Sequence, residues 1–230
     1  MIINKFAYHH YEREHSDGSR KYVTPTGRLY SVTTILEKTK PDEQKRALME
    51  WKRRVGEQQA QQITTEAANR GTRMHRFLEQ YLTEDTIRDP GSNPYSQQSH
   101  RMANLIAEKY LKPNCGEIYG NEVNLYYPDL YAGTTDCVAE WQGQLSIVDF
   151  KQTNKPKKES FIEDYFNQLA AYILAHDYLF ETNIKTGVIL MCSQNYELQH
   201  WVITGDKLEY YKTQWARRVE KFYQLNTSLR

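Results

Sequence analysis

The chain has 230 residues, enough for one large domain, and its 39% hydrophobic residues supply a substantial core. A formal net charge of +1 excludes a globally basic protein, so a nucleic-acid partner would be held by local basic patches. No apolar run approaches the length of a membrane span, and three widely separated cysteines argue against a disulfide framework and for a reducing compartment.

The first 40 residues predict an arm followed by a hairpin. Residues 1–19 are polar and aromatic and indicate a poorly ordered arm, and residues 20–32 predict a small hairpin around Pro25-Thr26-Gly27. A short helix begins near Ser31, with Thr33 or Thr34 available as its cap. The acidic residues of the arm are atypical of a mitochondrial targeting sequence, so we expect a cytoplasmic protein of a bacterium or a phage-infected cell.

Residues 41–112 are predicted to be almost entirely helical. Pro41-Asp42 opens a helix that ends at Gly56 and carries Trp51, Lys52 and Arg53. Two interpretations of this helix stay open. A basic helix with an indole can hold a phosphate backbone and stack a base, or Trp51 can be a buried anchor among solvated cations.

The next predicted helix covers residues 57–82. Its apolar stripe is Met74, Phe77, Leu78 and Tyr81, and Gly71 at mid-helix suggests close approach by another element. After a loop at 83–95, residues 97–111 form another helix that Pro113 closes. We expect the region 41–112 to form an arch or cap over a sheet.

A hairpin at residues 131–152 is the centre of the predicted sheet. Gln142-Gly143 suits a two-residue turn, and pairing Trp141 with Gln144 sets Asp136 opposite Asp149. Lys151 lies two residues further along and shares their face. Like charges across a ladder repel, so a divalent cation beside the ammonium fits this arrangement, although a solvated sheet end is the plainer alternative.

The C-terminal part predicts a helix, a second hairpin and a final helix. Ser160 and Glu163 resemble a capping box for a helix that runs to about residue 179 and presents Gln168 and Tyr172 on one face. Before it, Lys155 and its neighbouring lysines either grip a phosphate backbone or form a solvated loop. The whole pattern predicts an α/β fold with a mixed central sheet flanked by helices.

Gly133-Thr134-Thr135-Asp136 followed by Asp149-Phe150-Lys151 resembles the PD-(D/E)XK nuclease superfamily. The likeness is closest to its RecB-like branch, which includes the mitochondrial genome maintenance exonucleases and phage-encoded relatives. Supporting pieces spread over roughly residues 28 to 220. They are Ser31–Thr34, Trp51–Arg53, Arg70-Gly71 with His75, and Gln168 with Tyr172.

The resemblance implies a single nuclease domain over residues 1–230, with an N-terminal arm and hairpin at 1–40, a helical arch at 41–112 and a catalytic α/β core at 113–230. It implies Asp136, Asp149 and Lys151 as catalytic residues, and Mg²⁺ or Mn²⁺ held by His75, Asp136, Asp149 and the Phe150 carbonyl. A structural role for His75 and a secondary metal role for Glu122 are further alternatives. The residues implied in nucleic-acid binding are Thr33, Thr34, Trp51, Lys52, Arg53, Arg70, Lys155, Gln168 and Tyr172.

The activity that this resemblance implies is metal-dependent exonuclease cleavage of single-stranded DNA from free ends, leaving 5′-phosphates. A catalytically inactive nucleic-acid-binding module and an endonuclease of the same superfamily are the alternatives. Some relatives hold an iron–sulfur cluster on four cysteines, and with three cysteines we expect none here. We expect a monomer that binds single-stranded DNA and no membrane, and that works with phage or host replication or recombination proteins.

Overall fold

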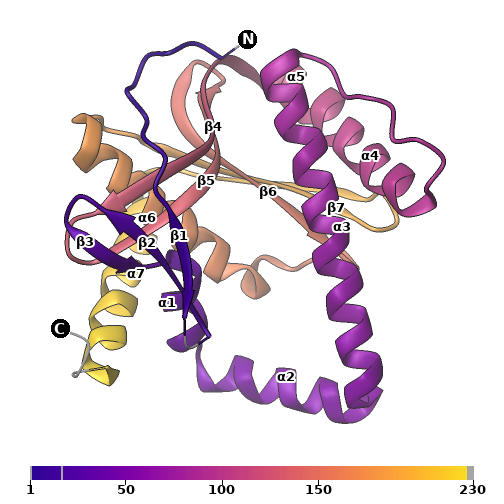
Figure 1. Ribbon diagram of the computed structural model, residues 1–230, viewed down its shortest axis with the longest axis horizontal. Helices are drawn as coiled ribbons and strands as arrows, with labels where there is room; N and C mark the ends of the chain where they lie inside the picture. The colour runs from indigo at the N-terminus through magenta and orange to yellow at the C-terminus, as the bar shows by residue number, and fades with distance from the viewer. Residues whose placement is uncertain (1, 17, 227–230) are drawn as a thin grey trace.

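The computed structural model describes residues 2–16 and 18–226 and has two sheets. A small antiparallel sheet contains β1 (Arg13–Ser16), β2 (Ser19–Thr24) and β3 (Gly27–Tyr30). The main sheet runs in sequence order through β4 (Cys115–Tyr127), β5 (Tyr131–Trp141), β6 (Gln144–Thr153), β7 (Thr186–Ser193) and β8 (Leu198–Ile203) (Figure 1). In the main sheet β6 and β7 are parallel, and the other neighbouring strands are antiparallel. The predicted α/β fold with a mixed sheet is therefore confirmed.

The central hairpin has the register that its turn predicts. Gln142 and Gly143 both have positive φ, 50° and 78°, as a two-residue hairpin turn requires. Trp141 pairs with Gln144, and the ladder continues to Cys137 opposite Val148. Past this pair β5 stays beside β4 as far as Tyr131, while its ladder with β6 ends. The two strands therefore part at Asp136 and Asp149.

Each face of the main sheet packs against two long helices. Val138 and Ile147 belong to the core under α6 (Glu163–Phe180) and α7 (Gly205–Leu225). Val148 and Phe150 belong to the core under α3 (Glu57–Glu84) and α4 (Pro94–Ile106). Side chains alternate between faces along a strand, so Asp149 and Lys151 lie on the α6 side. The predicted final helix is present as α7, and its apolar stripe is buried at Leu208, Tyr211, Trp215, Val219 and Phe222.

The N-terminal arm is docked, so the expectation of poor order is wrong for its described residues. The Ile3 amide donates to the Ile118 carbonyl of β4 at 2.7 Å. Tyr8 shares a hydrogen bond of 2.9 Å with His176 of α6, and the Phe6 ring stacks edge-on against the same imidazole. These aromatic contacts come from residues more than 100 positions away, which local sequence patterns do not reveal.

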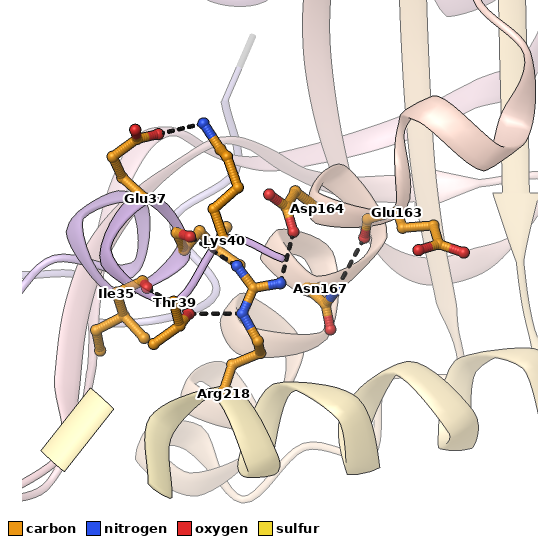
Figure 2. Close-up of polar contacts among 9 residues, drawn as sticks. Ile35, Glu37, Thr39, Lys40, Glu163, Asp164, Asn167 and Arg218 are labelled. Atoms are coloured by element: carbon orange, nitrogen blue, oxygen red, sulfur yellow. Dashed lines mark hydrogen bonds and ion pairs between the residues drawn. The ribbon is translucent and has the colours of Figure 1, made fainter. Parts of the chain in front are cut away.

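A short helix, α1 (Val32–Lys38), connects the small sheet to the helical region. Its cap is Ser31, whose Oγ accepts from the Thr34 amide at 3.0 Å, so the prediction of Thr33 or Thr34 as the cap is wrong. Arg218 of α7 holds the end of this helix by donating to Thr39 Oγ1 at 2.6 Å and to Asp164 of α6 at 2.8 Å (Figure 2). This contact fixes where the chain leaves for the next helix.

The helices after α1 extend away from the sheet. None of the residues of α2 (Asp42–Val55), all of which the structure describes, is buried, and Trp51 is half-buried. In α3 the buried positions are Ala60 and then Arg70 onward, so its first half projects with α2 (Figure 1). Gly71 sits where Gln152 of β6 approaches, because a Cβ there would lie 3.2 Å from Gln152 Cγ. The predicted close approach at Gly71 is confirmed.

Two predicted helix ends differ from the structure. The helix expected from residue 97 begins at Pro94 with Asn93 as its cap, and it passes through a π-helical turn (Ala107–Leu111) and α5 (Lys112–Asn114) across Pro113. The Ser160–Glu163 capping box is wrong, because Ser160 lies inside a 3-10 turn (Glu159–Phe161) and Ile162 precedes α6. Among the described residues, no helix has both the length and the apolar character needed to cross a membrane.

Candidate metal centre

The parting of β5 and β6 brings side chains from three elements together. The Phe150 amide of β6 donates to Asp136 Oδ2 at 2.7 Å, which ties the two strands beyond their last ladder pair. The other oxygen, Asp136 Oδ1, lies 3.4 Å from Nδ1 of His75 on α3. The structure therefore places the predicted His75 beside the first predicted aspartate. It places the Phe150 amide there, and a metal-ligand role for the Phe150 carbonyl stays a prediction.

Asp149 and Lys151 lie next to this pair on β6. Asp149 is 1% exposed, and its Oδ2 forms an ion pair with Lys151 Nζ. The ammonium also lies 4.9 Å from the centre of the Tyr165 ring of α6. A nearly buried carboxylate is costly without a partner, so the ion pair keeps Lys151 at the end of the sheet.

Glu122 of β4 completes the closest set of potential ligands in the described residues. One ligand atom each from His75, Glu122 and Asp136 lies within 4.8 Å of the others. Glu122 has a φ of 50°, a left-handed backbone that is uncommon for glutamate, and β4 has register shifts around Ile118 and Gly120. Such bulges re-aim side chains beside functional sites. A glycine inside a strand often marks a bulge, so Gly120 was a sequence signal that could have found this one.

The electrostatics of the cluster are those of crowded acids. Burial, together with Asp136 and Glu79, raises the pKa of Glu122 to about 7. Burial outweighs the Lys151 ammonium and raises the pKa of Asp149 to about 6. For His75, burial favours the neutral ring, but the Asp136 carboxylate prevails and raises its pKa to about 9.

These raised pKa values mean that the cluster binds protons more readily than isolated side chains of the same types do. A protonated His75 supplies positive charge, and a divalent cation would replace that proton and relieve the repulsion among the carboxylates. Carboxylate oxygens are the ligands that Mg²⁺ and Mn²⁺ prefer, and the donor set fits either ion.

Gln168 and Tyr172 of α6 lie under the acids. Gln168 donates to the Tyr172 hydroxyl at 3.1 Å, and both side chains are buried. The Tyr172 ring covers Gly133 of β5, where a Cβ would lie 2.7 Å from Tyr172 Cε1. In this position the pair supports the sheet end, and direct contact with nucleic acid stays a prediction.

Arg70 connects α3 to the end of β6 and to the turn between β7 and β8. It is 6% exposed and donates to Gln152 at 2.9 Å, to Gln194 at 3.3 Å and to Asn154. Its partners are the end of β6 and the turn between β7 and β8, more than 80 residues distant in the chain. All three are neutral amide oxygens, and burial lowers the pKa of this guanidinium from its usual value. Direct contact of Arg70 with nucleic acid stays a prediction.

Three of the predicted nucleic-acid contacts share one cavity. A cavity of about 680 Å³ is lined by Trp51, Arg70 and Lys155, together with Ile63, Glu66, Asn154, Lys157 and Gln194. Lys52 and Arg53 are exposed on α2. Thr33 and Thr34 lie apart, in a cavity of about 440 Å³ beside β1 and β2, where Thr34 Oγ1 accepts from the Arg20 amide at 3.1 Å.

No protein-family model matches the chain. Mitochondrial genome maintenance exonuclease 1 of Xenopus tropicalis is 30% identical to it over 211 residues, 85% of this chain and 58% of that protein. The human protein of the same name is 27% identical over 204 residues, 84% of this chain and 57% of that protein. The chain is similar to these mitochondrial genome maintenance exonucleases over most of its own length. The resemblance to these exonucleases, which the motifs predicted, is thereby confirmed.

The chain spans less than three fifths of the length of these two relatives. The mouse protein of that name is 26% identical over 94% of this chain. Among solved structures, a crystal structure from Eubacterium rectale has a TM-score of 0.47 and 13% identity, over 66% of this chain and 64% of that one. That likeness is too distant to bear on function.

Proposed function

We propose that this protein is a metal-dependent exonuclease that hydrolyses single-stranded DNA from free ends and leaves 5′-phosphates. The observation that carries the proposal is the meeting of Asp136, Asp149 and Lys151 at the end of the sheet, with His75 beside them. The homology to proteins named exonucleases agrees with this chemistry.

The metal would be held by His75, Glu122 and Asp136, whose ligand atoms lie within 4.8 Å of one another. Asp149, which interacts electrostatically with Asp136 and His75, would supply a further carboxylate. When bound, Mg²⁺ or Mn²⁺ polarises the phosphodiester and lowers the pKa of a water. Lys151 orients the attacking water and neutralises charge that develops on the phosphate. Asp149 fixes the ammonium in place, and the buried Tyr172 under Gly133 keeps the strand end rigid.

The path of the strand follows the larger cavity. Lys155 and Lys157 offer ammonium groups to successive phosphates, and the half-buried Trp51 offers an aromatic face to a base. Because α2 and the first half of α3 extend away from the sheet, we propose that they form an arch beneath which a single strand passes. Entry under such an arch favours free ends.

The decisive experiment is an assay on labelled single strands. With Mg²⁺, the wild-type chain is expected to degrade linear single-stranded DNA and to leave covalently closed circles intact, and EDTA abolishes the reaction. Lys151→Met removes cleavage but keeps binding, measured by anisotropy in EDTA. Lys221→Met, on the exposed face of α7, is the matched control with normal activity.

Three results would contradict the proposal in different ways. Cleavage by Lys151→Met at the wild-type rate would show that the catalytic site is not the cluster around Lys151. Discrete fragments from circular single strands would make the protein an endonuclease. Binding without cleavage in either metal would make it a nucleic-acid-binding module.

A further inference from the structure

A second polar cavity adjoins the one that holds Trp51. It has a volume of about 360 Å³ and lies between α3, the start of α4 and the turn after β7. Glu66, Arg70 and Gln194 line both cavities, so the two meet along a shared wall. Nothing in the proposed chemistry uses the second cavity.

Its most unusual feature is Tyr95. The ring is 63% exposed although it lies over the cavity, and the Arg73 guanidinium is 5.8 Å from its centre. Arg73 is itself held by Ser99, 3.4 Å from its Nε, so the cation stays near the ring. An exposed aromatic face next to a fixed guanidinium is a surface on which a planar base stacks.

The remaining lining groups match the edge of a base. The Asn69 amide has no hydrogen-bond partner among the described residues, and Gln98 reaches the Gln194 carbonyl at 3.3 Å. Glu66 accepts from Gln62 at 2.8 Å through Oε1, which leaves Oε2 for another donor. A carboxylate repels phosphate, so a strand in this cavity presents a base edge to Glu66.

We propose that this cavity, lined by Tyr95, Arg73, Glu66, Asn69 and Gln98, is a nucleobase subsite for the substrate strand. It rests on the proposed function and deepens it. The base stacks on Tyr95, and Glu66 accepts a hydrogen bond from an exocyclic amino group. Cytosine has such a group and thymine has a carbonyl in its place, so the subsite favours cytosine over thymine. The base next along the strand lies at Trp51, across the wall that the two cavities share.

The test for stacking measures binding of a labelled 20-nucleotide dC strand by anisotropy in EDTA, where no cleavage occurs. Tyr95→Ala is expected to weaken binding by roughly tenfold, the loss of about one stacked base, and Tyr95→Phe to bind as the wild type does. The matched control is Tyr178→Ala, because Tyr178 is a tyrosine on α6 that is 55% exposed, and this variant is expected to keep the wild-type affinity.

The test for base preference compares dC and dT strands of the same length. The wild type is expected to bind dC more tightly, and Glu66→Gln to reduce the ratio at least twofold. Glu57→Gln makes the same charge change at an exposed position near the start of α3 and leaves the ratio unchanged.

Three results would overturn the subsite. Equal dC binding by Tyr95→Ala and Tyr178→Ala would show that Tyr95 does not stack on a base. An unchanged ratio of dC to dT affinity in Glu66→Gln would show that Glu66 does not distinguish the bases. Saturable binding of dCMP that needs Tyr95, with strand binding unaffected by Tyr95→Ala, would assign the cavity to a free nucleotide. Failure of the wild type to bind any single strand would instead defeat the proposed function itself.

Discussion

Replacing Gly133 with alanine tests whether the Tyr172 ring sets the packing beneath the acids. A Cβ at Gly133 would lie 2.7 Å from Tyr172 Cε1 and 3.2 Å from its hydroxyl, and the ring is fully surrounded. Overpacking of this kind costs about 1–3 kcal/mol. The φ of Gly133 is not in the left-handed region, so alanine is otherwise acceptable there. We expect Gly133→Ala to lower the free energy of unfolding by about 2 kcal/mol.

A double-mutant cycle isolates the contact. Tyr172→Ala alone should cost about 3–5 kcal/mol, because it leaves a cavity and an unpartnered Gln168. In the double mutant the new methyl group has no ring to clash with. The double mutant should therefore lose about 1–3 kcal/mol less unfolding free energy than the two single mutants lose together. Urea unfolding of the four proteins measures this coupling. Additive losses would refute the view that the ring fills the space above Gly133.

Three further predictions concern other parts of the molecule. Arg218→Ala should lower the free energy of unfolding by about 2 kcal/mol, because it removes the donor that serves Asp164 and the Leu36 carbonyl, while the exposed Arg217→Ala should change it little; urea unfolding measures both. Burial lowers the pKa of His176 to about 4, so the unfolded chain takes up a proton that the folded one refuses. Stability due to this group should be complete above about pH 6.5 and decline by up to about 3 kcal/mol toward pH 4, and a His176→Phe variant that lacks this part of the decline in unfolding curves checks it. His75 and Glu122 must both lose their protons to bind a cation, so Mn²⁺ affinity by calorimetry should fall below about pH 9 and more steeply below about pH 7, and Glu122→Gln should weaken binding and remove the steeper part.

The central hairpin was predictable from sequence because its information is local. Gln142-Gly143 fixes the turn, the turn fixes the register, and the register places Asp136 and Asp149 at one sheet end. The period of two then places Lys151 on the same face. The final helix was predictable for the same reason, since its apolar stripe recurs every three or four residues.

Features that depend on distant residues were not predictable. The arm before β1 is ordered by His176, and Arg70 is buried by amides from β6 and the β7–β8 turn. Glu122 lies in the candidate metal centre because β4 has register shifts and the backbone is left-handed at Glu122. The predicted capping box of α6 was wrong for a local reason, because residues 159–161 form a 3-10 turn where the helix start was expected.

The exposed position of α2 has a consequence for how the protein is degraded. A helix without buried side chains adds little to the cooperative unit, whereas β6 is paired on both sides within the sheet. Brief fraying of α2 presents the bonds after Lys52, Arg53 and Arg54 to a trypsin-like protease while the sheet stays folded. A bound strand under α2 would shield these bonds, so susceptibility to the protease reports occupancy without any need for turnover.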